Sequence, residues 1–116
     1  MFSLSSTQQY YLYSQPTDMR KSFDGLCGLV SSKMGRNPTS GEVFIFIGTR
    51  KDAIKLLHWE HGGFVLYYKR LEKGTFEPAK STSESSTLPI SWPSLVFLIE
   101  GIRVEKYSQK TRFQAR

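Results

Sequence analysis

Residues 42–71 read EVFIFIGTRKDAIKLLHWEHGGFVLYYKRL, and this stretch sets the class of fold. It contains three apolar runs rich in β-branched and aromatic residues, separated by short connectors that carry glycine and charged residues. We predict strands over residues 42–47, 53–59 and 64–71. Connectors this short join only antiparallel neighbours, so the three strands are predicted to form a meander.

A helix is predicted on the N-terminal side of the meander, after a short β-prone segment at residues 10–13. Asp18 or Thr17 is placed to cap a helix that starts near Met19 and ends at Gly35. Apolar residues recur along it at helical spacing and predict one buried stripe: Phe23, Leu26, Cys27, Val30 and Met34.

Smaller elements are predicted beyond the meander. A short fourth strand is expected around residues 75–77, and the Ser- and Thr-rich segment 78–87 is expected to form a flexible loop. Ser91 followed by Pro93 predicts the cap and first turn of a second helix. Residues 105–116 are expected to form a basic tail.

These elements predict an α+β fold, with an antiparallel three- to four-stranded β-meander packed against one N-terminal helix and a second short C-terminal helix. The 116 residues are expected to form a single domain. Its ordered core is expected to cover about residues 10–77 and 88–104.

The pairing of the strands determines which side chains share a face. If Trp59 pairs with Phe64, and Ile47 with Ile54, one face is aliphatic and suited to cover by the first helix: Val43, Ile45, Ile47, Ile54, Leu56 and Val65. The other face mixes aromatic rings with cations: Phe44, Phe46, Lys55, Leu57, Trp59, Phe64, Leu66, Tyr68 and Arg70. Such a face suits nucleic acid, because rings stack on bases and cations meet phosphates. The alternative is that the second helix covers it and the rings belong to the core.

Lys and Arg outnumber Asp and Glu by 16 to 10, and this excess favours an anionic partner. The alternative is a solvated surface that is basic without having such a partner. Antiparallel strands would bring the cations of the first hairpin turn and of the last strand to the same end of the sheet. The candidate phosphate contacts are Arg20, Lys21, Arg50, Lys51, Lys55, Lys69, Arg70 and Lys73. The candidates for base stacking or partner contact are Trp59, Phe64 and Tyr68. The alternative for the cations is paired surface charge.

The residue types needed for catalysis or metal binding do not converge in the sequence. A metal site needs three or four convergent ligands, and His58 and His61 are the only histidines. A metal-dependent nuclease needs several carboxylates at one site, and the only aspartates are Asp18, Asp24 and Asp52. We therefore expect no enzymatic activity, no metal and no cofactor.

The single cysteine, Cys27, excludes an internal disulfide and fits a reducing compartment. The N-terminal residues lack a basic region followed by an apolar one, and the longest apolar runs are far too short to cross a membrane. We expect a cytoplasmic protein with no membrane contact.

Three stretches carry a family resemblance: residues 16–26 (PTDMRKSFDGL), residues 44–59 with their Arg50-Lys51-Asp52 and Lys55-Leu56-Leu57-His58-Trp59 segments, and residues 63–76. In this order and spacing they resemble the small accessory proteins, often called TnpB, of the insertion sequence 66 family of bacterial transposable elements. The resemblance covers roughly residues 10–77, with a weaker similarity over 88–102.

The resemblance implies an auxiliary role in transposition beside a separate, larger transposase that carries the catalytic acids. The implied partners are DNA, at the element ends or the target, and that transposase. Our first hypothesis is a non-catalytic accessory protein that binds DNA phosphates, the transposase, or both. The alternative is a protein–protein adaptor for the transposase with no DNA contact. A third hypothesis, an unrecognised nuclease, predicts metal-dependent cleavage that is lost when Asp52 is changed.

Overall fold

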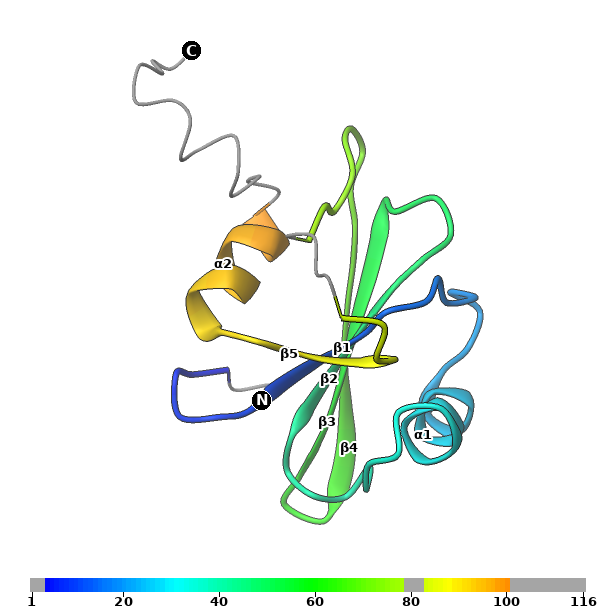
Figure 1. Ribbon diagram of the computed structural model, residues 1–116, viewed down its shortest axis with the longest axis vertical. Helices are drawn as coiled ribbons and strands as arrows, with labels where there is room; N and C mark the ends of the chain where they lie inside the picture. The colour runs from blue at the N-terminus through cyan, green and yellow to red at the C-terminus, as the bar shows by residue number, and fades with distance from the viewer. Residues whose placement is uncertain (1–3, 79–82, 101–116) are drawn as a thin grey trace.

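A computed structural model describes residues 4–78 and 83–100 of the chain (Figure 1). They form a five-stranded sheet with one helix on each face, so the predicted α+β class is confirmed. The elements in chain order are β1 (Tyr10–Tyr13), α1 (Phe23–Ser32), β2 (Val43–Ile47), β3 (Ala53–Glu60), β4 (Gly63–Arg70), β5 (Thr87–Ile90) and α2 (Trp92–Glu100). No helix within the described ranges combines the length and the apolar character needed to cross a membrane.

The sheet has the strand order β4-β3-β2-β1-β5. β2, β3 and β4 are antiparallel neighbours, and the pairs Ile47–Ile54 and Trp59–Phe64 lie in the predicted register. β1, however, pairs with β2 in parallel, and β5 pairs with β1 antiparallel. The prediction of a purely antiparallel sheet is therefore wrong. A parallel pair requires a crossover connection, and the segment that contains α1 supplies it between β1 and β2.

The short strand predicted around residues 75–77 is absent from the described structure. The chain there is instead tied to the β2–β3 turn, since the Phe76 N–H donates to the carbonyl oxygen of Lys51 at 2.7 Å and the Phe76 ring is fully buried.

The fifth strand of the sheet starts at Thr87, inside the segment predicted to be a flexible loop. It contains Pro89, which an edge strand accepts because it needs only one ladder of hydrogen bonds. The remaining predictions for residues 79–82 and 101–116, including the basic tail, lie outside the described residues.

Helix α1 begins at Phe23, four residues after the predicted start. Ser22 occupies the capping position without a side-chain hydrogen bond, so the predicted caps Asp18 and Thr17 are wrong. Asp18 instead accepts hydrogen bonds from the main-chain N–H and guanidinium of Arg20. The buried stripe is confirmed at Leu26 and Val30, whereas Phe23 is 43% exposed. Helix α1 ends at Ser32 and not at Gly35, so Met34 is buried but lies beyond the helix.

The two helices cover the opposite faces from those expected. Helix α1 packs on the aromatic face, where Leu26 and Val30 meet Phe44, Phe46 and Leu57. Helix α2 packs on the aliphatic face, where its Leu95 and Leu98 join a buried cluster: Tyr10, Leu12, Val43, Ile45, Ile47, Ile54, Leu56 and Phe76. The face that α1 covers follows from the parallel crossover, because such crossovers have a nearly fixed hand.

The second helix forms where it was predicted. Ser91 precedes α2, and its Oγ accepts a hydrogen bond from the main-chain N–H of Ser94 at 3.2 Å. Pro93 lies in the first turn, where its missing N–H removes no intrahelical hydrogen bond.

Candidate nucleic-acid interface

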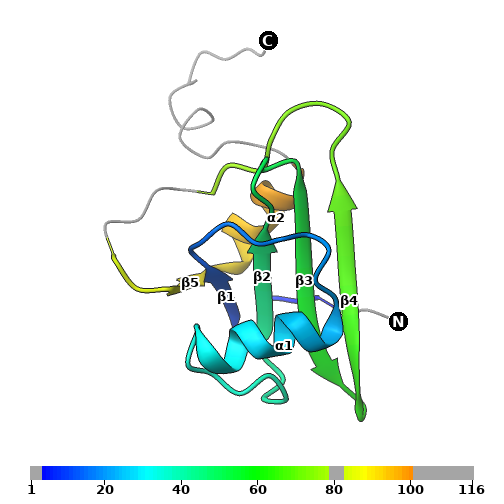
Figure 2. The ribbon, with the colours of Figure 1, turned by 90° about the vertical axis from the view of Figure 1, so that its right-hand side faces the viewer.

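A groove of about 660 Å³ lies at the end of the sheet where β2 and β4 finish and β3 begins. Three segments form its walls: the chain before α1, the β2–β3 turn and the end of β4. Figure 2 shows the first of these crossing the strands on its way from β1 to α1. The charged and aromatic residues that line the groove are Asp18, Arg20, Arg50, Asp52, Tyr68 and Arg70.

The chain before α1 lies directly against the β2–β3 turn. The Thr17 N–H donates to the carbonyl oxygen of Ile47 at 2.9 Å, and Thr17 forms an isolated parallel bridge with Gly48. A Cβ atom at Gly48 would lie only 2.7 Å from Cγ of Met19. Gly48 is therefore required for this close approach, which brings Asp18 and Arg20 to the groove.

Lys55 on β3 fastens the same segment to the sheet. Its side chain is buried, and Nζ donates to the carbonyl oxygens of Met19 and Lys21 at 2.8 and 2.7 Å. Nζ also lies 4.7 Å from the ring centroid of Tyr68. These partners compensate the burial of the ammonium group. Lys55 thus supports the groove from within and is not exposed for a phosphate contact.

The three groove arginines differ in their partners. Arg20 forms an exposed ion pair with Asp18, with Nη2 and Oδ2 2.8 Å apart. Hydrogen bonds from Arg20 hold the pKa of the Asp18 carboxyl well below its ordinary range. Arg50 and Arg70 are exposed, and neither forms an ion pair with any residue in the described part of the chain. Arg50 and Arg70 therefore remain available to an anionic ligand.

The other candidate cations lie outside the groove. Lys51 is 3.7 Å from Glu77, and Lys69 points to the other face of the sheet, where Nζ donates to the carbonyl oxygen of Ile99 at 2.9 Å. Lys73 is exposed in the chain after β4, and Lys21 is exposed with its stem beside Gly25. The structure thus brings together Arg20, Arg50 and Arg70 and disperses the lysines.

The three aromatic candidates also separate. Trp59 and Phe64 pack edge to face, with ring centroids 4.9 Å apart, at the turn between β3 and β4. Tyr68 lies four residues further along β4, about 13 Å from Phe64. Tyr68 is 52% exposed and borders the groove.

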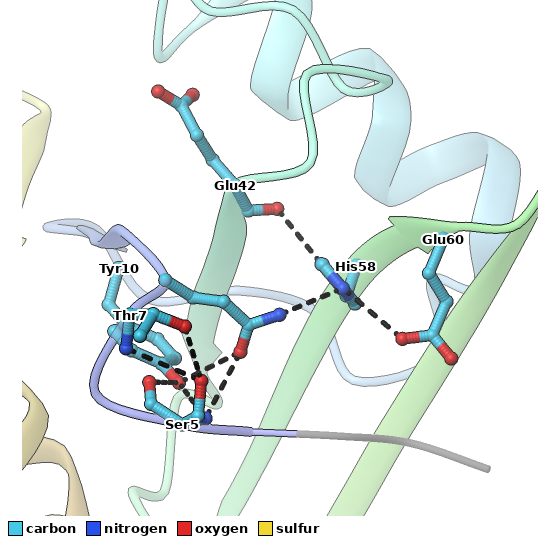
Figure 3. A network of polar contacts seen from close by, with 7 residues as sticks. Ser5, Thr7, Tyr10, Glu42, His58 and Glu60 are labelled. Atoms are coloured by element: carbon cyan, nitrogen blue, oxygen red, sulfur yellow. Dashed lines mark hydrogen bonds and ion pairs between the residues drawn. The ribbon is translucent and has the colours of Figure 1, made fainter.

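A buried polar network surrounds His58 (Figure 3). Nδ1 lies 3.5 Å from the carbonyl oxygen of Glu42, while Nε2 lies 3.1 Å from the Gln8 amide nitrogen and 3.3 Å from a carboxylate oxygen of Glu60. The ring therefore ties the N-terminal segment to β3. Within residues 4–78 and 83–100, no three His, Cys, Asp or Glu side chains are grouped to hold a metal ion.

Comparison with known proteins identifies the family of the chain. A family model described as "IS66 Orf2 like protein" matches residues 8–109. The chain belongs to the IS66 Orf2-like family. The resemblance read from the sequence is confirmed, and this family suggests an accessory role in transposition.

Two curated proteins of Sinorhizobium fredii are similar to this IS66 Orf2-like protein. One, y4jC, is 36% identical over 63 residues, which cover 54% of each chain, so the match spans about half of that relative. The other, y4hO, is 33% identical over 86 residues, covering 74% of this chain and 73% of the relative. No solved structure matches.

The stretches that carry the family resemblance converge at the groove. Residues 16–26 contribute Asp18 and Arg20, and residues 44–59 contribute Arg50 and Asp52. Residues 63–76 contribute Tyr68 and Arg70. Segments far apart in this IS66 Orf2-like chain therefore meet at a single concave surface.

Proposed function

We propose that this IS66 Orf2-like protein is a non-catalytic accessory factor in transposition that binds DNA phosphates in the groove. The observation that carries the proposal is the convergence of Arg50 and Arg70, two exposed arginines with no ion-pair partner among the described residues. A guanidinium presents a planar fork of N–H donors that matches a phosphate. Arg20 adds a third guanidinium at the rim, already paired with Asp18.

The rest of the chain supports an anionic ligand. Its formal net charge of +6 attracts a polyanion from a distance and raises the association rate. Phosphate contacts of this kind position a protein on DNA but do not read its sequence. We therefore assign the groove to backbone binding, with the choice of DNA site left to other components of the transposition machinery.

The test is a fluorescence-anisotropy titration of labelled duplex and single-stranded DNA from about 50 to 200 mM salt. Arg50→Gln and Arg70→Gln are each expected to weaken binding about 10-fold. Each should reduce the magnitude of the slope of log affinity against log salt by about 0.9 for the duplex and about 0.7 for the single strand. Lys33→Gln is the matched control, because it removes one exposed positive charge that does not line the groove.

Two results contradict the proposal. One is an affinity that does not change with salt. The other is a loss for Lys33→Gln as large as the loss for the arginine variants, which would mean that net charge alone attracts the DNA.

A second candidate function, an adaptor for the transposase, is favoured by the position of β4. This eight-residue strand lies at one edge of the sheet and pairs with β3 alone among the described strands. An open edge of this length accepts an extended segment from a partner protein. If the adaptor role is correct, the transposase co-purifies with the double variant Arg50→Gln/Arg70→Gln as well as with the unmodified protein.

A further inference from the structure

The groove combines its arginines with one exposed aromatic ring. Tyr68 lines the groove together with Arg50 and Arg70, and about half of the residue is exposed. Trp59 and Phe64 pack against each other near the opposite end of the hairpin. Of the three aromatic candidates, Tyr68 is therefore the one that a strand bound to the arginines can reach.

The ring of Tyr68 is held in place before any ligand arrives. The Lys55 ammonium lies 4.7 Å from the ring centroid, and that ammonium is itself fixed by the carbonyl oxygens of Met19 and Lys21. A tyrosine side chain has few torsions to lose, and this contact restricts them further. A ring positioned in this way meets a second planar group with little loss of entropy.

We infer that the groove binds an unpaired nucleotide of a DNA strand, with its base stacked on Tyr68 and its flanking phosphates on Arg50 and Arg70. The inference rests on the proposed function, because the same arginines supply the phosphate contacts. In a duplex each base is paired and stacked between its neighbours, so Tyr68 reaches one only if the duplex opens. The protein is therefore expected to prefer single-stranded DNA to a duplex of the same sequence.

The size and charge of the groove suit contact with a short segment of a DNA strand, with two of its phosphates bound. A volume of about 660 Å³ lies within the range of sites that enclose a small molecule. Arg20 is already paired with Asp18, and Asp52 adds a second carboxylate to the lining. No ion pair within the described residues joins Asp52 to Arg50 or Arg70, so these two arginines remain to contact phosphates. Two such contacts give a slope of log affinity against log salt of about −1.4 for a single strand.

The test compares three labelled oligonucleotides of about 15 nucleotides with the full chain: a single strand, its duplex, and a strand in which abasic sites replace the bases. The abasic strand keeps every phosphate and removes every ring. We expect the single strand to bind about 10-fold more tightly than either of the others. Tyr68→Leu should bind the single strand about 10-fold more weakly than the unmodified protein does, with the affinity that the unmodified protein has for the abasic strand. The affinity of Tyr68→Leu for the duplex should be unchanged. Tyr68→Phe, which keeps the ring, should bind like the unmodified protein.

The outcomes separate this inference from the proposed function. If all three oligonucleotides bind equally, with losses for Arg70→Gln and none for Tyr68→Leu, phosphate binding stands and stacking on Tyr68 is overturned. If none binds at low salt, both ideas fail. An RNA strand of the same sequence that binds at least as tightly as the DNA strand overturns the assignment to DNA. Circular dichroism of each variant checks that the fold is retained.

Discussion

Polar and aromatic residues make different contacts at the two ends of the sheet: the end near the β3–β4 turn and the end where β3 begins and β4 finishes, called the open end below. Near the turn end, Arg36 donates two hydrogen bonds to the Glu42 carboxylate, at 2.9 and 2.7 Å, and lies 4.1 Å from the ring centroid of Tyr11. At the open end, Arg50 and Arg70 have no ion pair within the described residues and line a groove. The same residue type thus stabilises the fold at one end and is left free for a ligand at the other.

The aromatic residues show the same contrast. At the turn end, Trp59 and Phe64 pack edge to face against each other. His58, the residue before Trp59 on β3, contacts polar groups of Gln8, Glu42 and Glu60. Tyr68 at the open end is half exposed, with a cation against its ring. The contacts at the turn end stabilise the fold, whereas the proposed function assigns DNA binding to the open end. If both assignments are correct, variants at the two ends should affect stability and DNA affinity separately.

Phe64→Ala should produce the largest effect on stability and break the turn end. It removes the edge-to-face contact with Trp59 and part of the packing on the α1 face, which is expected to cost about 3 kcal/mol of unfolding free energy. Urea unfolding followed by circular dichroism measures the loss. DNA affinity of the folded protein should not change, and a drop in affinity without a drop in stability would contradict the assignment of this end.

Lys55→Met should have the next largest effect and weaken the support of the open end. The substitution leaves the carbonyl oxygens of Met19 and Lys21 without their donor and is expected to cost about 2 kcal/mol. Urea unfolding measures this loss. Lys33→Met is the matched control, because Lys33 is exposed, and its unfolding free energy should change by no more than about 0.5 kcal/mol. If the two variants are equally stable, Lys55 does not anchor the segment before α1.

Glu42 should make the turn end sensitive to acid. The hydrogen bonds from Arg36 lower the pKa of the Glu42 carboxyl, so the folded state binds its proton less readily than the unfolded state. Its contribution, about 1 kcal/mol or less, is present above roughly pH 4 and is lost as the pH falls through the lower folded value. The unfolding free energy should decrease less steeply between about pH 6 and pH 3 for Glu42→Gln than for the unmodified protein. Urea unfolding at each pH measures it. Parallel curves would show that the pair does not contribute.

Thr17→Val should have the smallest effect and probe the floor of the groove. Thr17 is buried, and its Oγ1 finds no hydrogen-bond partner in the described part of the chain. Replacing the hydroxyl with a methyl group removes an unsatisfied polar atom, so stability should stay the same or rise by up to about 1 kcal/mol. Thermal unfolding measures this, and a clear loss of stability would mean that the hydroxyl has a partner in solution.

Much of the sheet could be predicted from the sequence because its signals are local. The alternation of side chains and the short connectors of residues 42–71 predicted the β2–β3–β4 register. The place of β1 beside β2, and hence the face that α1 covers, depends on pairing between segments about 30 residues apart. The helical connection between two β-prone segments was the available signal for a parallel pair.

The candidate site was predicted only in part, because it also depends on contacts between segments distant in the sequence. Arg50 and Arg70 were expected at one end of the sheet, and the structure places both in the groove. Lys55 resembled them in the sequence, but its partners are main-chain carbonyl groups, which every residue possesses. Sequence alone therefore could not distinguish a buried lysine from a free surface cation, nor foresee that the chain before α1 would bring Arg20 to the groove.

The edge position of β4 affects how quickly its backbone hydrogen bonds open. A strand bonded on one side opens by local fraying, whereas the buried strand β2 opens only with the wider structure. Main-chain amides near Tyr68 and Arg70 should therefore exchange their hydrogens with solvent sooner than those of β2. A ligand that joins Arg70 to Arg50 across the groove would slow this exchange, so the rate at these few amides reports occupancy directly.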